Sequence, residues 1–450
     1  MKDILKTIAE TIKGTQFRNR TYAVGGFVRD HVMGKTSSDL DIVVELDNGG
    51  MELAEFLYER GISSRPVIFK NFGTAFVLIE NRKIEFVMTR KESYRDKNRK
   101  PEVEAGSLKE DVFRRDFTIN SLVMNVGTGE IADITGFGIS DIKNKNIRST
   151  SNPEIIFSED PLRMLRAVRF AVQLDFKIET KTEKGIRDNH DKLNFISWER
   201  RRDEFIKIIT LPKPRKGLKM LISFGLMKNL IPELLELEDV TQNKYHDDDV
   251  WEHTLKTLHN SGKDLVVRLA ALLHDIAKPQ TRSSDENGVH FYRHESIGAE
   301  LSKKILSRLK FPAKISSQVA CIIRNHVRLK QFGDDLKDMS DKAVRRLVMD
   351  MGDDLESFLQ LVHADNISHA PGHCLHNQGY NLRKRIALVP KKIIEKKLPV
   401  SGKDIMLHFG LDEGKKIGIL MNRVKEIWLE YPDWSKEKIL NSIKPEEEKW

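Results

Sequence analysis

Two aspartates, Asp39 and Asp41, lie two residues apart at the start of an apolar stretch that ends at Val44. The β-branched residues of this stretch predict a strand, and the alternation of side chains along a strand places both carboxylates on one face. Two neighbouring carboxylates repel each other unless a cation lies between them. Mg²⁺ suits such a pair, because it is usually bound by one or two carboxylates together with substrate phosphates. The pair therefore predicts metal-assisted chemistry on a phosphate group.

A glycine pair and an arginine precede these aspartates. Gly25 and Gly26 have no Cβ, so their backbone N–H groups can approach a phosphate closely. Arg29 can donate two parallel hydrogen bonds to phosphate oxygens. Arg115, which precedes an apolar run, is a candidate second phosphate ligand, since a triphosphate carries more charge than one arginine offsets. The alternatives are an ordinary glycine-rich turn before a core strand and, for Arg115, a surface ion pair.

The following segments predict a small mixed α/β region. Residues 51–60 predict a short helix, and residues 74–80 and 83–89 predict two strands. Glu85, an acidic residue among apolar neighbours on the second strand, is either a third metal carboxylate or a charge on an edge strand. Residues 90–107 are charged, contain proline and glycine and lack an apolar period, which predicts a mobile surface loop.

An arginine-rich helix is predicted from Ser158 onward. Glu159 and Asp160 lie at its N-terminus and Pro161 lies in its first turn. Residues three apart are neighbours on a helix, so a carboxylate and a guanidinium can project together from one ridge. The alternative is a solvated basic face. The arginines follow Asp160 at steps of three: Arg163, Arg166 and Arg169.

Three motifs in this order carry a family resemblance: GGFVRD with DLD, then RRDFTIN, then EDPLRMLRAVRF. They resemble the class II tRNA nucleotidyltransferase (CCA-adding enzyme) and bacterial poly(A) polymerase family over residues 20–235. The resemblance implies a polymerase-β-like head and a helical neck, with Asp39 and Asp41 as the metal pair. It implies that the triphosphate is bound by Gly26, Arg29 and Arg115. It also implies that the incoming nucleotide is bound by Asp160, Arg163, Arg166 and Arg169.

The chemistry of the bases shows how Asp160 and Arg163 could select C and A over U and G. C and A each present an exocyclic amino group beside a ring-nitrogen acceptor, whereas U and G present a carbonyl and a ring N–H. Asp160 could accept from the amino group while Arg163 donates to the ring nitrogen. U or G would leave buried groups unpaired, which costs free energy. Such a pair would select bases without a nucleic-acid template.

Eleven of the 14 histidines lie between His246 and His376. With the adjacent His274 and Asp275 in an apolar segment, this region resembles the HD phosphohydrolase superfamily, in which a helical bundle binds one or two metals. By that resemblance the core ligands are His253, His274, Asp275 and Asp365, and a second metal could use His294 and His326. These ligand types do not distinguish Mn²⁺, Ni²⁺, Fe²⁺ and Mg²⁺. The alternatives are structural histidines and an inactive tRNA-binding scaffold.

Length and charge are consistent with these resemblances. A chain of 450 residues predicts several domains. We expect an α+β head followed by all-α domains, with the boundaries 1–148 (head), 149–236 (neck), 237–385 (HD domain) and 386–450 (tRNA-binding tail). The net charge of +9 favours a polyanionic partner such as nucleic acid. Two cysteines, no signal peptide and no membrane-spanning apolar run predict a cytoplasmic protein without a membrane partner.

These features predict a template-independent enzyme that adds CCA to tRNA 3′ ends from CTP and ATP and uses Mg²⁺. Two metal ions about 3.5–4 Å apart would activate the RNA 3′-hydroxyl and neutralise the pyrophosphate leaving group. The HD region would use a divalent metal to hydrolyse a phosphoester. The alternatives are a poly(A) polymerase, an enzyme restricted to A or to CC, and an HD phosphohydrolase whose head only binds tRNA. The segment 90–107 argues against a CC-only enzyme, and the intact aspartate pair argues against the last alternative.

Overall fold

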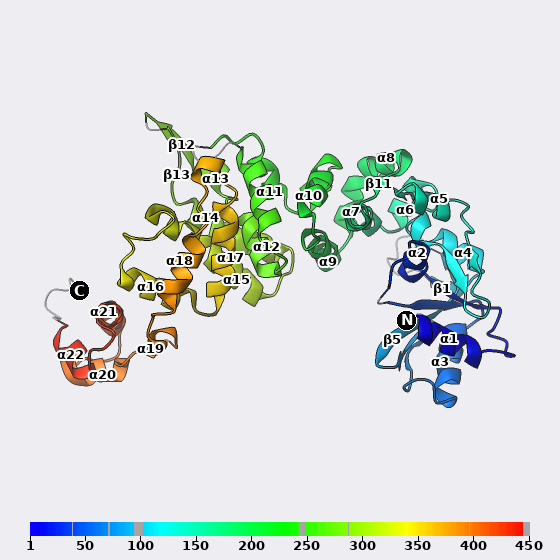
Figure 1. The fold of residues 1–450 in the computed structure, drawn as a ribbon, viewed down its shortest axis with the longest axis horizontal. Coiled ribbons are helices and arrows are strands. Elements are labelled where there is room, and N and C mark those ends of the chain that lie inside the picture. The colour runs from blue at the N-terminus through cyan, green and yellow to red at the C-terminus, as the bar shows by residue number, and fades with distance from the viewer. Residues whose placement is uncertain are drawn as a thin grey trace. The chain divides into compact units, whose positions relative to one another are not determined.

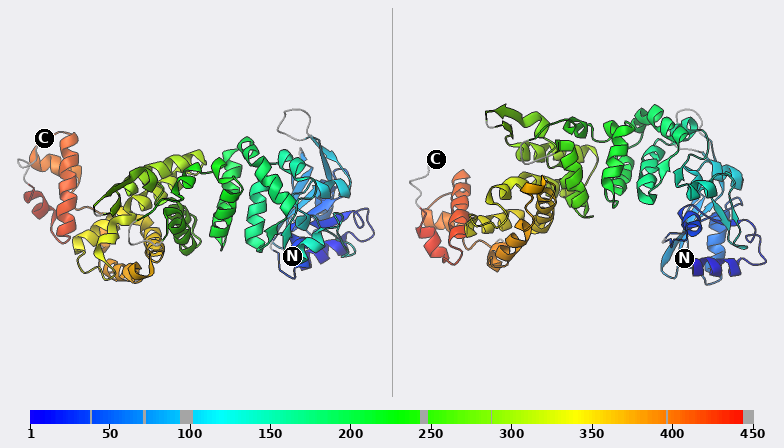
Figure 2. Two further views of the ribbon diagram at one scale, coloured as in Figure 1. Left: turned by 90° about the horizontal axis from the view of Figure 1, so that it is seen from above. Right: turned by 45° about the horizontal axis from the view of Figure 1, so that its top comes forward.

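The computed structural model describes residues 1–37, 39–70, 73–93, 102–242, 248–286, 288–395 and 397–443. The chain forms two compact units, Met1–Leu230 and Ile231–Trp450. The first unit contains a large sheet and a set of helices, and the second is built from helices and one β-hairpin (Figures 1 and 2). The predicted boundaries within each unit remain predictions.

A seven-stranded sheet organises the first unit, with the strand order β3-β4-β5-β2-β1-β8-β9. β2 and β5 pair in parallel, whereas the other neighbours pair antiparallel. The helices α1 and α3 contribute to the core on one face of this sheet. The bounds are α1 Lys2–Thr11, β1 Thr21–Val24, β2 Asp41–Val44, α3 Gly49–Glu59, β3 Val67–Phe69, β4 Thr74–Ile79, β5 Arg82–Met88, β8 Val123–Asn125 and β9 Ile131–Ala132.

Alternation along β2 separates the two faces of the sheet as predicted. Leu40 and Ile42 are buried in the core shared with α1 and α3. Val43 faces the other way, into a smaller core with Val112 of helix α4 (Leu108–Phe113). Asp41 therefore lies on the α4 face of the sheet.

The helical part of the first unit differs from the prediction at one point. The helix predicted from Ser158 begins later, as α7 (Leu162–Leu174), and Ser158 and Glu159 instead end a preceding helix, α6 (Pro153–Glu159). Asp160 lies between them in an extended conformation. A residue that precedes proline is disfavoured in the helical region, and Pro161 follows Asp160, so α6 ends there. The three arginines lie on α7 as expected.

The segment predicted as a loop over residues 90–107 is partly a β-ribbon. β6 (Arg90–Ser93) pairs antiparallel with β7 (Glu102–Ala105), and residues 94–101 lie outside the described residues. Backbone hydrogen bonds hold this pair together, and a charged sequence can form them without an apolar period. The other elements of this unit are α2 Gly26–Val32, η2 Thr118–Asn120, α5 Gly138–Lys143, β10 Asn146–Ile147, β11 Lys177–Ile178, α8 Thr180–Asn189, α9 Trp198–Ile209 and α10 Pro214–Ser223.

The second unit contains a helical bundle in which α12 packs against α11, α15 and α17. A separate apolar core in the C-terminal segment gathers α19 to α22 around the buried Trp428. Within the described ranges, no helix is long and apolar enough to cross a membrane. The elements are α11 Val250–Asn260, α12 Leu265–Leu273, α13 Lys278–Thr281, β12 Arg282–Asp285, β13 Gly288–Phe291, α14 His294–Arg308, α15 Ala313–Asn325, η6 His326–Phe332, α16 Asp341–Met351, α17 Leu355–Asn366, α18 Gln378–Ile386, α19 Lys391–Ile394, α20 Gly402–Phe409, α21 Lys415–Glu430 and α22 Lys436–Asn441.

Candidate functional site

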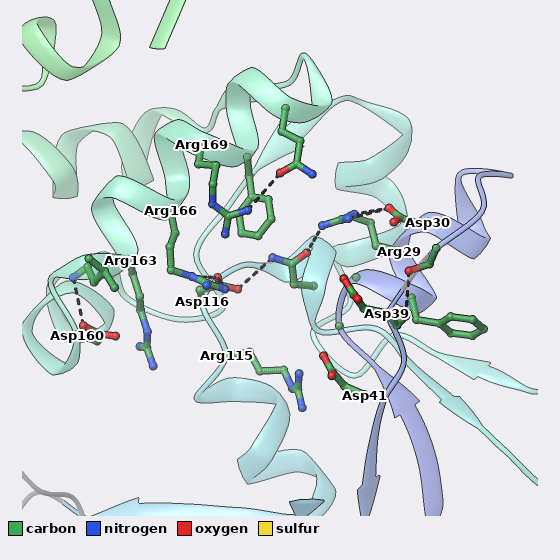
Figure 3. A pocket seen from close by; sticks show the side chains of 18 of the residues that line it. Arg29, Asp30, Asp39, Asp41, Arg115, Asp116, Asp160, Arg163, Arg166 and Arg169 are labelled. Atoms are coloured by element: carbon green, nitrogen blue, oxygen red, sulfur yellow. Dashed lines mark hydrogen bonds and ion pairs between the residues drawn. The ribbon is translucent and has the colours of Figure 1, made fainter. Parts of the chain in front are cut away.

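A cavity of about 660 Å³ lies in the first unit, where the sheet meets α7 (Figure 3). The structure brings the predicted head and neck residues together around it, with the exception of Glu85, which does not line it. Asp39 and Asp41 lie at one end of the labelled group in Figure 3, and Asp160 and Arg163 lie at the other. The predicted residues that line the cavity are Gly25, Gly26, Arg29, Asp39, Asp41, Arg115, Asp160, Arg163, Arg166 and Arg169.

The acidic end of the cavity is set by the strand register. Asp41 is the first residue of β2, and its direct cross-strand partner on β5 is Glu85. The pKa of Asp41 is raised, first by partial burial and then by the charge of Glu85, although Arg115 acts in the opposite direction. Asp39, Asp41 and Glu85 do not form a cluster with ligand atoms within 4.8 Å of one another. A metal ion here would therefore be held by part of this set together with phosphate oxygens.

The glycine turn passes directly beside this acidic end. Gly25 has a φ of +70°, a region that strongly favours glycine. A Cβ atom at Gly25 would lie 3.6 Å from Asp41 Oδ2 and 3.9 Å from Arg115 Nη1. The backbone therefore comes close to both a candidate metal ligand and a candidate phosphate ligand.

A buried aspartate that the sequence analysis did not identify orients Arg115. Asp111 Oδ2 accepts hydrogen bonds from Arg115 Nε and Nη2 at 3.2 and 2.8 Å, and its Oδ1 accepts from Arg114 at 3.0 and 2.6 Å. Burial raises the pKa of Asp111, but the two guanidinium charges outweigh it and hold the pKa below its usual value. The signal in the sequence was the spacing of three and four residues between Asp111 and the two arginines.

A second network connects α2 with α7. Arg29 donates to Asn120 Oδ1 (2.8 Å), and Asn120 donates to Asp116 Oδ1 (3.2 Å). Arg166 of α7 donates through Nε and Nη2 to Asp116 Oδ2, at 2.8 and 2.6 Å. Asp116 and Asn120 are buried. Burial raises the pKa of Asp116, but the charge of Arg166 and the hydrogen bonds lower it by more. The net pKa is below its usual value, so the carboxylate stays charged.

Three arginines surround one aromatic ring in the cavity wall. The guanidinium carbons of Arg29, Arg166 and Arg169 lie 5.6, 5.4 and 4.1 Å from the centroid of Phe170. Arg169 also donates to Glu204 Oε2 at 2.7 Å. Cations over a ring face gain cation–π stabilisation, and together they give this wall a positive potential suited to an anion.

The predicted base-selecting carboxylate is bonded to other protein groups. Asp160 Oδ1 accepts from the backbone N–H of Leu162, the first residue of α7, at 3.2 Å. Asp160 Oδ2 accepts from Arg200 Nη2 at 2.9 Å. A nucleobase at Asp160 would therefore exchange places with Arg200.

Arg163 is bonded to α6 and to the head. It donates to Ile156 O at 3.2 Å, to Glu159 Oε2 at 2.9 Å and to Arg114 O at 2.6 Å. The sequence analysis placed Asp160 and Arg163 on one ridge, and the break between α6 and α7 changes that relation. Both residues line the cavity, and their roles toward a base remain predictions.

Among the described residues, the second unit contains two clusters of candidate metal ligands, all buried except His294, which is partly buried. His253, His274 and Asp365 form one, and Asp275, His294 and His326 form the other, each with ligand atoms within 4.8 Å of one another. The predicted HD residues thus come together from α11, α14, α17 and the ends of α12 and α15. His246 lies outside the described residues.

Asp275 lies between the two clusters. Its Oδ2 is 3.1 Å from His274 Nε2, and its Oδ1 is 3.5 Å from His294 Nε2 and 3.8 Å from His326 Nε2. One carboxylate with an oxygen toward each set is suited to bridge two metal ions. The sequence resemblance predicts Asp275 as a ligand of the first set alone. It does not identify His369, whose Nε2 is 3.9 Å from Asp365 Oδ1.

The imidazoles are held in the tautomer that metal binding requires. Nδ1 of His274, His294 and His326 faces a backbone carbonyl oxygen at 2.9, 2.7 and 2.6 Å, so Nδ1 carries the proton. Nε2 of His294 and His326 is buried without a hydrogen-bond partner, whereas Nε2 of His274 lies 3.1 Å from Asp275 Oδ2. A buried lone pair without a partner is costly. Divalent metal ions bound at the two clusters would accept these nitrogen lone pairs, so the residues present fit such ions.

Three family models match the chain. They are described as poly A polymerase head domain (residues 21–148), probable RNA and SrmB-binding site of polymerase A (175–237) and HD domain (250–356). The prediction of a multidomain chain with an α+β polymerase-type head followed by helical regions and an HD domain is confirmed.

Among curated proteins, an A-adding tRNA nucleotidyltransferase of Deinococcus radiodurans is 31% identical over 419 residues, which is 90% of each chain. A CC-adding tRNA nucleotidyltransferase of Thermus thermophilus is 28% identical over 90% of this chain and 88% of its own. A CCA-adding enzyme of Enterococcus faecalis is 42% identical over 44% of this chain and 47% of its own.

Solved structures share the fold. The CCA-adding enzyme of Bacillus stearothermophilus in complex with CTP aligns with a TM-score of 0.69 at 23% identity, over 97% of this chain and 94% of its own. The Thermotoga maritima CCA-adding enzyme complexed with tRNA aligns with a TM-score of 0.58 at 21% identity, over 98% and 93%.

The Asp116 network predicts a pH-dependent stability. The folded pKa of Asp116 lies below its unfolded value, so its contribution is present above about pH 4 and is lost as pH falls through the folded pKa. Asp116→Asn should therefore lower the free energy of unfolding at pH 7 by about 2 kcal/mol, and the melting temperature should fall with it. The difference from wild type should shrink below about pH 4. Differential scanning calorimetry measures both.

Asp175→Asn is the matched control. Lys216 and Lys213 hold the pKa of Asp175 at about 2, but this pair is solvent-exposed, so the change should have little effect on stability. A difference between wild type and Asp116→Asn that stays constant from pH 7 to pH 3 would contradict the assigned role.

The buried imidazoles predict metal-dependent stability of the second unit. Protein treated with a chelator should gain melting temperature when Mn²⁺ or Ni²⁺ is added, because a ligand at 100 times its Kd adds about 2.7 kcal/mol. His326→Ala should remove this gain and lower the bound metal measured by mass spectrometry. His363→Ala is the control, since His363 is exposed on α17 and belongs to neither cluster. An equal metal-induced gain in His326→Ala would refute the ligand assignment.

Proposed function

The chain belongs to the tRNA nucleotidyltransferase family, and from this premise we propose that it adds CCA to tRNA 3′ ends from CTP and ATP. Selection would need no nucleic-acid template, and pyrophosphate would be released. One observation carries the proposal: a single cavity combines the Asp39 and Asp41 carboxylates, the Gly25 turn and an arginine-lined wall. A cytoplasmic location is part of the same proposal.

In the proposed reaction, the RNA 3′-hydroxyl oxygen forms a bond to the α-phosphorus of the nucleotide. The bond from that phosphorus to the leaving oxygen breaks, and pyrophosphate departs. Asp39 and Asp41 would hold Mg²⁺, with Glu85 beside Asp41 as a further carboxylate. When bound, the metal would acidify the 3′-hydroxyl and neutralise charge on the leaving group.

The protein groups around the triphosphate would act mainly by position and charge. Arg115 would contact phosphate oxygens, in an orientation that the buried Asp111 fixes. The absence of a Cβ at Gly25 would let a phosphate approach the backbone. Preorganised donors of this kind stabilise developing negative charge without reorganising during the reaction.

The base would lie at the opposite end of the cavity, toward α7 (Figure 3). We propose that Asp160 accepts from the amino group of C or A and that Arg163 donates to the ring nitrogen. Arg200 would leave Asp160 when a base arrives, so Asp160 is paired in both states. Retained pairing limits the cost of burying that carboxylate.

We infer a second function from the two clusters of candidate metal ligands, in which Nε2 of His294 and His326 is buried without a hydrogen-bond partner. We propose that the HD region is a metal-dependent phosphohydrolase that acts on phosphates at RNA ends. His253, His274, Asp275 and Asp365 would hold one divalent metal, and His294 and His326 would complete a second site through Asp275. A bound metal would supply a hydroxide nucleophile.

The decisive experiment supplies tRNA that lacks CCA, together with Mg²⁺ and each labelled nucleotide, and sequences the products. The proposal expects C, C and A in order, with no U or G. A long A tract would indicate a poly(A) polymerase. Addition of A alone or of CC alone would indicate an enzyme of the kinds found in Deinococcus radiodurans and Thermus thermophilus.

Asp41→Ala should reduce nucleotide addition by about 10³-fold or more, because a metal site supplies several kcal/mol of transition-state stabilisation. Phosphatase activity of the HD region should remain. Asp47→Ala is the matched control, since Asp47 is an exposed carboxylate just beyond β2. Loss of both activities in Asp41→Ala would contradict two separate sites.

The base selector has its own test. Asp160→Asn replaces a pure acceptor by a group that also donates, so we expect UTP and GTP to compete with CTP and ATP. The preference for CTP and ATP over UTP and GTP should fall by about tenfold or more, because that factor corresponds to the free energy of about one hydrogen bond. Arg200→Ala is the control, because it frees Asp160 Oδ2 without changing the carboxylate and should keep the preference for C and A. If Asp160→Asn still discriminates against UTP and GTP as the wild type does, Asp160 does not select the base.

A further inference from the structure

An exposed apolar strip lies on the same sheet face as Asp41. The register places Asp41 of β2 opposite Glu85 of β5, Glu85 opposite Phe76 of β4, and Phe76 opposite Val67 of β3. Directly opposed residues project from the same face of a sheet. These four side chains therefore form one row that runs from the metal carboxylate to the edge of the sheet.

The apolar residues of this strip do not serve the core. Val67, Phe69 and Leu78 are 46%, 46% and 44% exposed. The alternate residues of the same strands, such as Val77 and Phe86, already fill the core on the other face. A contiguous exposed apolar patch on a globular protein often marks a site of interaction with another molecule.

The strip has the composition of a nucleobase platform. The rings of Phe69 and Phe76 are stacked, with centroids 6.0 Å apart at an interplanar angle of 30°. Lys83 Nζ lies 4.2 Å from the centroid of Phe76. Aromatic side chains stack with any base, and a neighbouring cation attracts the backbone phosphates.

The position of the strip relative to the cavity identifies its occupant. In the sheet order, the cavity residue Gly25, which directly follows β1, lies on the β1 side of β2, and Arg115 Nη1 is close to Gly25. The strip extends across β5, β4 and β3 on the other side of β2. Two substrates must meet at Asp41. If the nucleotide fills the cavity, the row from Asp41 to the sheet edge offers the RNA end a separate surface that begins at the same carboxylate.

We propose that Val67, Phe69, Phe76, Leu78 and Lys83 form a stacking platform for the last unpaired nucleotides of the RNA acceptor. Phe76 lies two strand spacings from Asp41, roughly 10 Å. When the 3′-hydroxyl of the RNA lies at Asp41, the last bases of the RNA would therefore lie over the rings of Phe69 and Phe76. This assignment rests on the proposed nucleotidyltransferase function and specifies how its second substrate binds.

The test uses a tRNA acceptor minihelix that lacks CCA and carries 2-aminopurine as its 3′-terminal base. Stacking on the platform should quench its fluorescence when wild-type protein binds. Phe76→Ala should reduce the quenching and raise KM for the RNA by about tenfold, since stacking contributes ~1–3 kcal/mol per base. KM for CTP should not change. Phe76→Trp should restore both, because it keeps an aromatic face.

Two further variants make the result decisive. Phe69→Ala removes an exposed ring, so it tests the platform even where Phe76→Ala does not fold. Tyr58→Ala is the matched control, because Tyr58 is 47% exposed on α3, which packs on the opposite face of the sheet, and it should change neither readout. Unchanged quenching and KM for the RNA in Phe69→Ala and Phe76→Ala would overturn the proposal.

Two other outcomes separate the competing explanations. Self-association that Phe69→Ala abolishes, with RNA binding intact, would assign the strip to a second copy of the chain and overturn the proposal. If wild-type protein adds no nucleotide, the proposed function fails, but the quenching still decides whether the strip binds an RNA end. Quenching that Phe76→Ala removes would then support the platform by itself.

Discussion

The first unit depends on buried carboxylates that neutralise clustered arginines. Guanidinium groups gathered around one cavity repel one another, and this repulsion would disperse them without counter-charges. Asp111 holds Arg114 and Arg115, Asp116 holds Arg166, and Glu204 holds Arg169. Each pair uses charge-assisted hydrogen bonds, which fix direction as well as charge. The cavity therefore presents positive charge in a defined arrangement before any anion enters it.

The sequence predicted the residues that face the ligand better than those that face inward. The spacing of Asp39 and Asp41 and the steps of the arginines on α7 carry their own signal. All of them line the cavity, although β2 begins at Asp41 and Asp39 precedes the strand. Asp116 has no such signal, because its partner Arg166 is 50 residues away in the sequence, and Asn120 bonds to Arg29, 91 residues away. Asp111 had a helical spacing to Arg114 and Arg115, but only the fold shows that it is buried beneath them. The break at Asp160 was readable from Pro161. The β6 and β7 pairing was not readable, because its charged residues show no apolar alternation. The sequence predicted the HD residues that come together, but the position of Asp275, with one oxygen toward each cluster, depends on the geometry of several helices.

The two candidate metal sites differ in the atoms they offer. The head offers carboxylate oxygens on the edge of a cavity, a set that suits a hard ion with substrate oxygens to complete it. The HD clusters offer imidazole nitrogens fixed by backbone carbonyls, a set that suits transition metals as well. A metal in the head would therefore depend on its substrate for part of its coordination, whereas a metal in the HD region would be held by protein atoms. In the second unit, Nε2 of His294 and His326 is already buried without a hydrogen-bond partner.

The alternation along β2 has a consequence for how this chain can change over generations. Ile42 and Val44 face the core, while Asp41 and Val43 face the other way, so every residue of the strand has an assigned side. Substitutions at one position leave this assignment intact. The deletion or insertion of a single residue within the strand would exchange the two sides, exposing the core residues and burying a carboxylate. Variation in length is therefore expected in the turns on either side of β2, and lineages should keep the spacing inside it unchanged.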